Sequence, residues 1–477
     1  MFSTVTRCCV PLITLLLSAC SLMEGEDYVP AIMDEQAQYK QWQHDQNQIE
    51  AAIDVNQITD LIAVPKLLTL VEQALQANPS LQQTALALEI AKVQRNITSG
   101  DRLPNASAGF NASKNEGMED VSYNADVSVS WELDLWHKLS DSTLAADMDV
   151  ASSRVDFQSA KDVLAATIMR TWLLLSWQQQ QVIIEQKKLQ LIQNNEKITL
   201  KRYRTGLGDL ADLDTSRSNT ASILATIVNH KENIARTQRN LSQLIGANYQ
   251  ETNFDVADEF PEVWVPLAQL PEQSLARRPD LQKAYYAIEG AQYRVKVAYK
   301  SLLPSISLSG SLSDVGSTPS DALLTSPVWG LLSQLTMPLF QGGKLHAQID
   351  VANLRAEQSY WAYKDVLLNA VVEVENNLAQ EKSLTQRLTH INEALTISRR
   401  SADHYQEKYR QGLVDIIELL QTQKQTFDLE IQLGQIRYDR LINRIDLGLA
   451  LGLGLKDQAQ TDSQESSPIT ASKRASL

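Results

Sequence analysis

The stretch VSYNADVSVSWELDL at residues 121–135 alternates strictly between apolar and polar side chains. In an extended chain Val127, Val129 and Trp131 share one face, and the serines between them share the other. A period of two residues predicts a β-strand with one apolar face. The shorter stretch NASAGFNAS at residues 105–113 alternates in the same way, and the loop 114–120 joins the two strands as a hairpin.

A second pair of strands is predicted further along the chain. Ile306, Leu308 and Leu312 oppose a run of serines in residues 305–313, and a weaker strand follows near 328–340 after the loop 314–327. Such strands suit either a soluble sandwich or a sheet between lipid and water. A sheet in lipid must close, because an open edge leaves backbone groups without hydrogen bonds. Four strands are too few for a barrel, so this interpretation requires several copies that pool eight, twelve or sixteen strands.

The chain is an internal duplication. The motif Asn78-Pro79-Ser80-Leu81 returns as Arg278-Pro279-Asp280-Leu281, and Tyr203-Arg204-Thr205-Gly206-Leu207 returns as Tyr409-Arg410-Gln411-Gly412-Leu413. Matches in one order at nearly one spacing indicate two copies of a structural unit. We therefore predict a first structural repeat over 65–246 with strands at about 103–136, and a second over 269–455 with strands at about 303–340. The acidic, proline-containing segment 247–268 is interpreted as an equatorial linker between them.

Each repeat contains a long segment without Gly or Pro, at residues 138–205 and 344–411. As one helix, each would extend roughly 100 Å at about 1.5 Å per residue. Apolar residues recur at sevenfold spacing, which is typical of helices packed side by side. They are Ile168, Leu175, Val182 and Leu189 in the first repeat and Leu367, Val374, Leu388 and Leu395 in the second, where Glu381 interrupts the series. The remaining faces are polar, which favours a hollow assembly over a solid core, with a coiled-coil rod as the alternative.

Further helices complete each repeat. We predict helices at 209–245 and from 413 to about 451, after the two glycines, and shorter ones near 66–99 and 270–300. The polar segment 456–477 is predicted to be a disordered tail.

The N-terminus has the pattern of a signal peptide. Residues 8–19 form an apolar run that is too short to span a bilayer, so residues 1–19 are predicted to be removed. The end of the run, Leu17-Ser18-Ala19-Cys20, resembles the lipobox of bacterial lipoproteins. The resemblance implies cleavage before Cys20, diacylglycerol and an N-acyl chain on Cys20, and a lipidated segment 20–64. Ser21 follows, where the inner-membrane retention signal usually has Asp, so the outer membrane is expected. The alternative is an ordinary secretory signal with a chance cysteine.

Composition argues against several classes of protein. The net charge of −14 is unlike the basic footprint of a nucleic-acid binder. The three cysteines all lie within the first 20 residues, and the six histidines are dispersed without the spacing of metal ligands. No catalytic motif stands out. The chain is therefore predicted to have no enzymatic activity, no metal and no cofactor apart from the lipid on Cys20.

Taken together, the motifs resemble those of TolC-type outer-membrane efflux channels, in the lipoprotein branch that serves tripartite, RND-type drug pumps. The resemblance rests on Trp131-Glu132-Leu133-Asp134-Leu135-Trp136, on the turn Pro338-Leu339-Phe340-Gln341-Gly342-Gly343 and on the paired Tyr-x-x-Gly-Leu motifs. It covers about residues 28–455. One departure is His137, where the family more often has Gly.

The resemblance implies a mainly α-helical fold with a membrane β-barrel. A homotrimer would form a 12-strand β-barrel and a 12-helix periplasmic α-barrel. Its expected partners are outer-membrane lipid, a periplasmic adaptor and an inner-membrane transporter, and its expected function is a passive exit duct for small molecules. The alternatives are the exit channel of a type I protein-secretion system, or a coiled-coil scaffold lipoprotein that forms no channel.

The resemblance also implies a gate at the helix-tip turns of Gly206 and Gly412. It assigns Asp415 and Glu418 to an acidic entrance ring, and Tyr409 and Asp212 to the contacts that hold the helices closed. Arg204 and Arg410 are the candidate cationic partners. The alternative is that acids in the first turn of a helix cap it and complement its dipole, without any role in gating.

Overall fold

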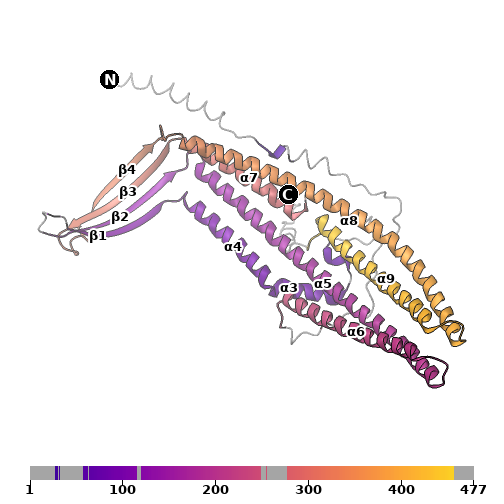
Figure 1. Cartoon of the computed structure of the whole chain (residues 1–477). Helices are drawn as coiled ribbons and strands as arrows, with labels where there is room; N and C mark the ends of the chain where they lie inside the picture. The colour runs from indigo at the N-terminus through magenta and orange to yellow at the C-terminus, as the bar shows by residue number, and fades with distance from the viewer. Residues whose placement is uncertain are drawn as a thin grey trace, which may run out of the picture. The chain divides into compact units, whose positions relative to one another are not determined.

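The computed structural model describes residues 27–30, 32, 57–62, 64–114, 116, 120–248, 254 and 277–455 (Figure 1). The predicted signal peptide, Cys20, most of the linker and the tail 456–477 lie outside the described residues. The chain divides into two compact units. The sheet unit comprises 1–39, 85–156 and 280–368, and the tip unit comprises 40–84, 157–279 and 369–477. Each unit is described separately below.

The sheet unit contains one antiparallel sheet of four strands in the order β1-β2-β3-β4 (Figure 1). The strands are β1 (Asn105–Ser113), β2 (Ser122–Leu133), β3 (Ser305–Gly316) and β4 (Val328–Thr336). The two predicted hairpins are confirmed, and β2 pairs with β3 to join the repeats. The register places Ala108, Val127, Leu312 and Trp329 in one row across the sheet, so the apolar face is continuous.

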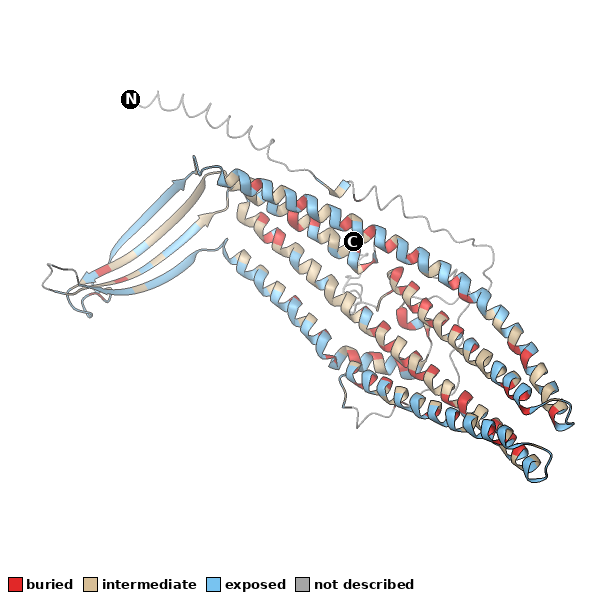
Figure 2. Ribbon diagram, viewed as in Figure 1, coloured by how far each residue is buried: buried red, intermediate tan, exposed pale blue. Residues whose placement is uncertain are grey.

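The apolar face of the sheet is not covered. Val127 is 37% exposed and Trp329 is 76% exposed, and all of β4 is exposed (Figure 2). A soluble sandwich requires a second sheet over this face. Within the described ranges the strands form a single sheet, so the sandwich interpretation has no second layer.

Two strands are shorter than predicted. β4 ends at Thr336 rather than near 340, and Pro338, which has no N–H to donate, follows two residues later. β2 ends at Leu133 because Asp134 turns to the next helix, where its carboxylate accepts hydrogen bonds from the backbone N–H groups of Leu139 and Ser140 at 2.9 and 2.8 Å.

The two long helices are confirmed as α5 (Lys138–Arg204) and α8 (Lys344–Arg410), each of 67 residues (Figure 1). A residue with positive φ precedes each helix, namely His137 (φ 58°) and Gly343 (φ 80°). Most of the sevenfold apolar positions are buried, as predicted: Ile168, Leu175, Val182, Leu367, Val374 and Leu395.

The predicted helix at 66–99 is wrong, because it is two helices, α3 (Pro65–Ala77) and α4 (Pro79–Gly100). Asn78 breaks it with an extended ψ of 120°, as expected for a residue before proline. Its side chain then caps α4 by accepting the Leu81 N–H at 2.9 Å.

Two other helices of the repeats, α6 (Leu210–Leu244) and α9 (Ile416–Ala450), lie close to their predicted positions. The helix predicted near 270–300 begins later, as α7 (Pro279–Lys300), because Arg277 and Arg278 before its proline are not α-helical. Residues 270–276 lie outside the described residues. No helix in the described ranges combines the length and the apolar character needed to cross a membrane.

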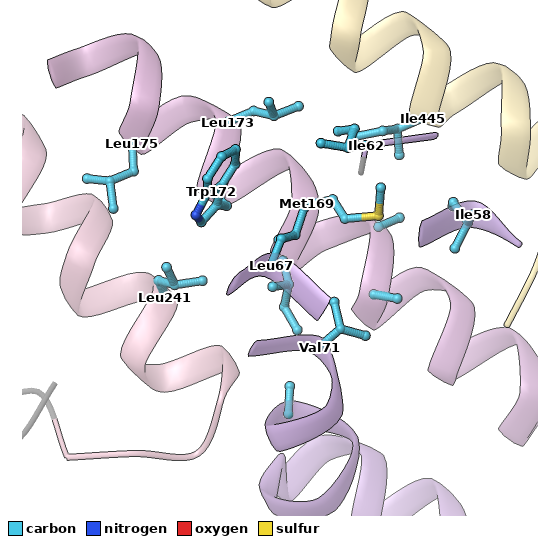
Figure 3. Packing of buried hydrophobic residues seen from close by; sticks show 14 of the residues in the cluster. Ile58, Ile62, Leu67, Val71, Met169, Trp172, Leu173, Leu175, Leu241 and Ile445 are labelled. Atoms are coloured by element: carbon cyan, nitrogen blue, oxygen red, sulfur yellow. The ribbon is translucent and has the colours of Figure 1, made fainter. Parts of the chain in front are cut away.

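The main hydrophobic core of the tip unit lies around Trp172 on α5 (Figure 3). Leu67 and Val71 of α3, Leu241 of α6 and Ile445 of α9 pack into the same cluster. The short 3-10 helix η2 (Ile58–Leu61) adds Ile58. Burial of these side chains holds α5 of the first repeat and α9 of the second in one core.

Candidate functional site

The two helix tips of the tip unit have the same backbone construction. After α5, Gly206 adopts φ +74° and the Leu207 N–H donates to the Arg202 carbonyl at 2.9 Å. After α8, Gly412 adopts φ +76° and the Leu413 N–H donates to the Lys408 carbonyl at 2.9 Å. Positive φ with a bond of this type is the Schellman ending of a helix, which favours glycine.

An aspartate caps the helix that follows each tip. Asp209 accepts the Asp212 N–H at 2.9 Å, and Asp415 accepts the Glu418 N–H at 2.9 Å. Asp209 and Asp415 therefore both act as N-caps, as capping at these positions predicts. A cap uses one carboxylate oxygen, and Asp209, Asp415 and Glu418 all remain exposed. Their negative charge is therefore still presented to solvent at the tips.

Tyr409 is buried at the base of the second tip. It is 4% exposed in a hydrophobic cluster with Ile192 of α5, Ile223 of α6 and Leu419 of α9. Its hydroxyl lies 3.4 Å from the Thr199 hydroxyl. The side chain therefore joins the ends of both helix pairs.

Arg202 extends the contact between the two tips. Its guanidinium lies over the Tyr409 ring at 5.2 Å, a cation–π geometry. Partial burial and the negative charges of Asp209 and Asp415 raise the pKa of Asp212, and the positive charge of Arg202 opposes them. The four residues Arg202, Asp212, Tyr409 and Asp415 are called the tip cluster below.

The predicted cationic partners are not the ones that the structure brings together. Arg410 pairs with Glu407 of its own helix at 3.6 Å, and both side chains are more than half exposed. Among the described residues no ion pair joins Arg204 or Arg410 to Asp212 or Asp415. Arg202 is instead the basic residue that contacts Tyr409 and whose charge acts on Asp212. The sequence carries a signal for it, because a basic residue precedes the tip tyrosine in both repeats, as Arg202-Tyr203 and Lys408-Tyr409.

The tip cluster offers charge and packing rather than catalytic chemistry. In the described ranges no group of three or more His, Cys, Asp and Glu side chains is placed to hold a metal ion. Exposed carboxylates at a helix tip can attract cations, and a buried tyrosine between two helix pairs can hold them together. The tip cluster therefore combines an exposed negative charge with a packing contact between the two tips.

Comparison with known proteins identifies the family. The chain matches the family described as "Outer membrane efflux protein" over residues 70–247 and 270–453, and it belongs to that family. It is 26% identical to the "Probable outer membrane lipoprotein SilC" of Salmonella typhimurium over 400 residues, which are 82% of this chain and 86% of SilC. It is 24% identical to the "Cation efflux system protein CusC" of Escherichia coli (strain K12) over 394 residues, 81% and 86% of the two chains.

A solved structure shows the same fold. The Campylobacter jejuni CmeC outer membrane channel matches with a TM-score of 0.78 at 19% identity, covering 90% of this chain and 96% of that chain. The predicted resemblance is confirmed, and with it the outer-membrane location and the efflux function. The family is one of transport proteins, and the mainly helical fold is that of its channels.

Proposed function

We propose that this protein is the passive exit duct of a tripartite efflux pump and acts as a homotrimer. Twelve strands from three copies would close a β-barrel, and twelve helices would surround a periplasmic tunnel. A periplasmic adaptor and an inner-membrane transporter would deliver the cargo and supply the energy. The name of CusC makes metal cations the first cargo to test.

The observation that carries the proposal is the open four-stranded sheet. β1 and β4 are its two edges, and among the described residues neither edge strand has a second partner. Unpaired edges cannot remain open in lipid, and β4 presents Trp329, Leu331 and Leu335 with more than two thirds of each side chain exposed. Pairing of β1 with β4 of a neighbouring copy would satisfy both edges.

An apolar stripe on α4 supports the same association. Leu86, Ile90, Val93 and Ile97 follow at helical spacing and are 62%, 68%, 57% and 59% exposed. Contiguous exposed apolar residues of this kind mark contact surfaces. A second copy of the chain, held beside the first by the shared sheet, is the occupant that we propose.

Lipidation of Cys20 remains part of the proposal. The lipobox at 17–20 and the name of SilC as an outer membrane lipoprotein support it. We also propose the domain bounds given above. The two repeats comprise 65–246 and 269–455, the linker between them comprises 247–268, and the tail comprises 456–477.

We further propose that the tip cluster is the gate of the duct. Arg202 and Tyr409 would hold the second tip against the first in the closed state. Asp415 and Glu418, repeated in three copies, would form an acidic entrance that favours cations. The charge of Asp212 would interact with Asp415 and with Arg202. Arg410 would lie at the exposed edge of the gate.

The test is single-channel recording of the purified full-length protein in planar bilayers. We expect a heat-modifiable trimer with cation-selective current. Asp415→Asn removes the charge but keeps a good capping residue, so cation selectivity should fall several-fold without loss of the trimer. Asp209→Asn is the matched control, because it changes an equivalent cap on the first tip and should leave selectivity nearly unchanged.

Two outcomes would contradict these proposals separately. A monomer without current would eliminate the duct and favour the coiled-coil scaffold. A conducting trimer in which Asp415→Asn and Asp209→Asn behave alike would keep the duct and eliminate the entrance ring.

A further inference from the structure

The sheet unit contains a hollow of about 500 Å³, and none of the tip-cluster residues lines it. Helices α7 and α8 form two of its walls, and the short N-terminal segment at Asp27 and Tyr28 forms a third. Five polar or charged side chains face it from the helices and the N-terminal segment: Asp27, Gln292, Lys296, Asn353 and Glu357. A cavity of this size is in the range that holds a small organic molecule.

The N-terminal wall is fixed by specific contacts. The Gln292 side-chain amide donates to Asp27 Oδ1 at 3.0 Å, and the Val29 N–H donates to the same oxygen at 3.1 Å. The Tyr28 ring stacks on Tyr360 of α8, with centroids 5.1 Å apart. These contacts hold one carboxylate and one aromatic ring at the edge of the hollow.

The two carboxylates of the hollow are bonded to neutral groups. Asp27 is held by an amide and a backbone N–H, and Glu357 accepts the Trp361 indole N–H at 3.4 Å. The ammonium group of Lys296 lies over the Tyr293 ring of its own helix at 5.1 Å. Within the described ranges no ion pair joins Asp27 or Glu357 to a cation, and two of the three charged side chains that line the hollow are negative.

The aromatic lining suits a cation as well. Tyr28 and Tyr299 line the hollow, and the Asn353 side-chain amide lies 3.5 Å from the Tyr299 hydroxyl. The face of an aromatic ring attracts ammonium groups through its quadrupole. Burial and the hydrogen bond to Glu289 raise the pKa of Tyr285 on α7 to about 12, and the negative charge of Asp27 adds a smaller contribution in the same direction.

We propose that this hollow binds an organic cation, with its ammonium group between Asp27 and Glu357 and its apolar body against Val295, Leu354 and the tyrosine rings. The ligand would contact the N-terminal segment and both helices at once. Its binding would therefore fasten the N-terminal segment to α7 and α8. The inference does not depend on the proposed duct, because it rests only on the lining and contacts of this hollow within the sheet unit.

The test is isothermal titration of the full-length detergent-solubilised protein with benzyltrimethylammonium. We expect one site per chain and an affinity that weakens as salt is added, since the attraction is partly electrostatic. Glu357→Gln and Asp27→Asn should each reduce the affinity at least five-fold. The matched control is Asp350→Asn, an exposed acid seven residues earlier on α8, which should bind like the parent.

Two further arms separate a cation site from a general apolar hollow. Benzyl alcohol has the same ring without the charge and should bind at least ten-fold more weakly. Tyr28→Phe should retain most of the affinity and Tyr28→Leu should lose it. Equal binding of the alcohol, or unchanged affinity in Glu357→Gln with an unaltered melting temperature, would overturn the proposal. Single-channel current in the same variants reports on the duct independently.

Discussion

From the start of the long helices onward, the two repeats share a backbone frame at a spacing of 206 residues, but different side chains fill it. Gly206 and Gly412 end the long helices, and Asp209 and Asp415 cap the next ones. Gly246 and Gly452, with φ of +66° and +76°, end those in turn. The turn and capping residues thus define the repeat.

The ends of α6 and α9 show how one structural need is met by different residues. In the first repeat Asn78 donates to the Leu244 carbonyl at 2.8 Å, and in the second Arg278 donates to the Ala450 carbonyl at 2.8 Å. Both residues directly precede the proline of the duplicated motif. The carbonyl groups at the end of a helix need a donor, and either side chain supplies one.

The largest difference lies in the middle of the long helices. Leu175 of α5 is fully buried in the main hydrophobic core, whereas Glu381, 206 residues later on α8, is 3% exposed. The Glu381 carboxylate accepts hydrogen bonds from Arg440 and Arg444 of α9, each at 2.7 Å. Burial alone would raise the pKa of Glu381, but Arg444 and Arg440 outweigh it and hold that pKa below its ordinary value. At this position the first repeat therefore joins its helices by apolar packing, and the second joins them by a buried ionic cluster.

The largest predicted effect comes from breaking the ionic cluster. Glu381→Ala leaves Arg440 and Arg444 without their shared carboxylate, and we expect a loss of about 3–5 kcal/mol in the free energy of unfolding. Guanidinium unfolding of the detergent-solubilised protein measures it.

The control replaces the whole cluster by the residues of the first repeat. Glu381→Leu, Arg440→Ile and Arg444→Gln together reproduce Leu175, Ile234 and Gln238. This triple variant should be close to the parent in stability or above it, because no buried charge is left unpaired. A triple variant as unstable as Glu381→Ala would show that the repeats do not share interchangeable packing.

The parent and the triple variant should also differ in how much stability they lose at low pH. The folded pKa of Glu381 is lowered, so its stabilising contribution is present above the ordinary Glu value of about 4.3 and is lost as the pH falls through the folded value. The triple variant lacks this group and should lose less stability than the parent below about pH 4. Melting temperatures across this range test the sign.

A smaller effect is expected at the start of the long helices. His137 and Gly343 occupy equivalent places with positive φ, and a side chain in this region is strained. Gly343→His should therefore cost about 1 kcal/mol, and His137→Gly should gain at most about 1 kcal/mol. A Cβ atom at Gly343 meets nothing within 4 Å, so the cost should come from the backbone alone. Thermal unfolding tests both variants. A higher melting temperature for Gly343→His, or a lower one for His137→Gly, would contradict this account.

The smallest predicted effect concerns Asp212 at the first tip. Partial burial and the neighbouring carboxylates raise its pKa, so its contribution to stability is present below about pH 3.9 and is lost as the pH rises through the raised value. Asp212→Asn should consequently melt slightly higher than the parent at neutral pH and no higher at pH 3. Asp214→Asn, on the same helix, is the control, and an equal gain there would indicate a general charge effect.

Much of the fold could be predicted from local patterns. The lack of Gly and Pro over 138–205 and 344–411 predicted α5 and α8 to within one residue. Strict alternation predicted the first hairpin, and a weaker alternation predicted the second. The break at Asn78 was missed, although the following Pro79 carried the signal for it. The tip glycines were recognised, whereas Arg202 was not, because its partner Tyr409 lies on another helix.

The sequence by itself determined where the chain turns, because positive φ, capping and extended alternation depend on residues a few positions apart. It also determined the duplication. The tertiary structure decided which tip tyrosine is buried, with Tyr203 42% exposed and Tyr409 4%, and which arginines neutralise Glu381. These outcomes depend on contacts between helices far apart in the sequence, and no local pattern encodes which side chains meet there.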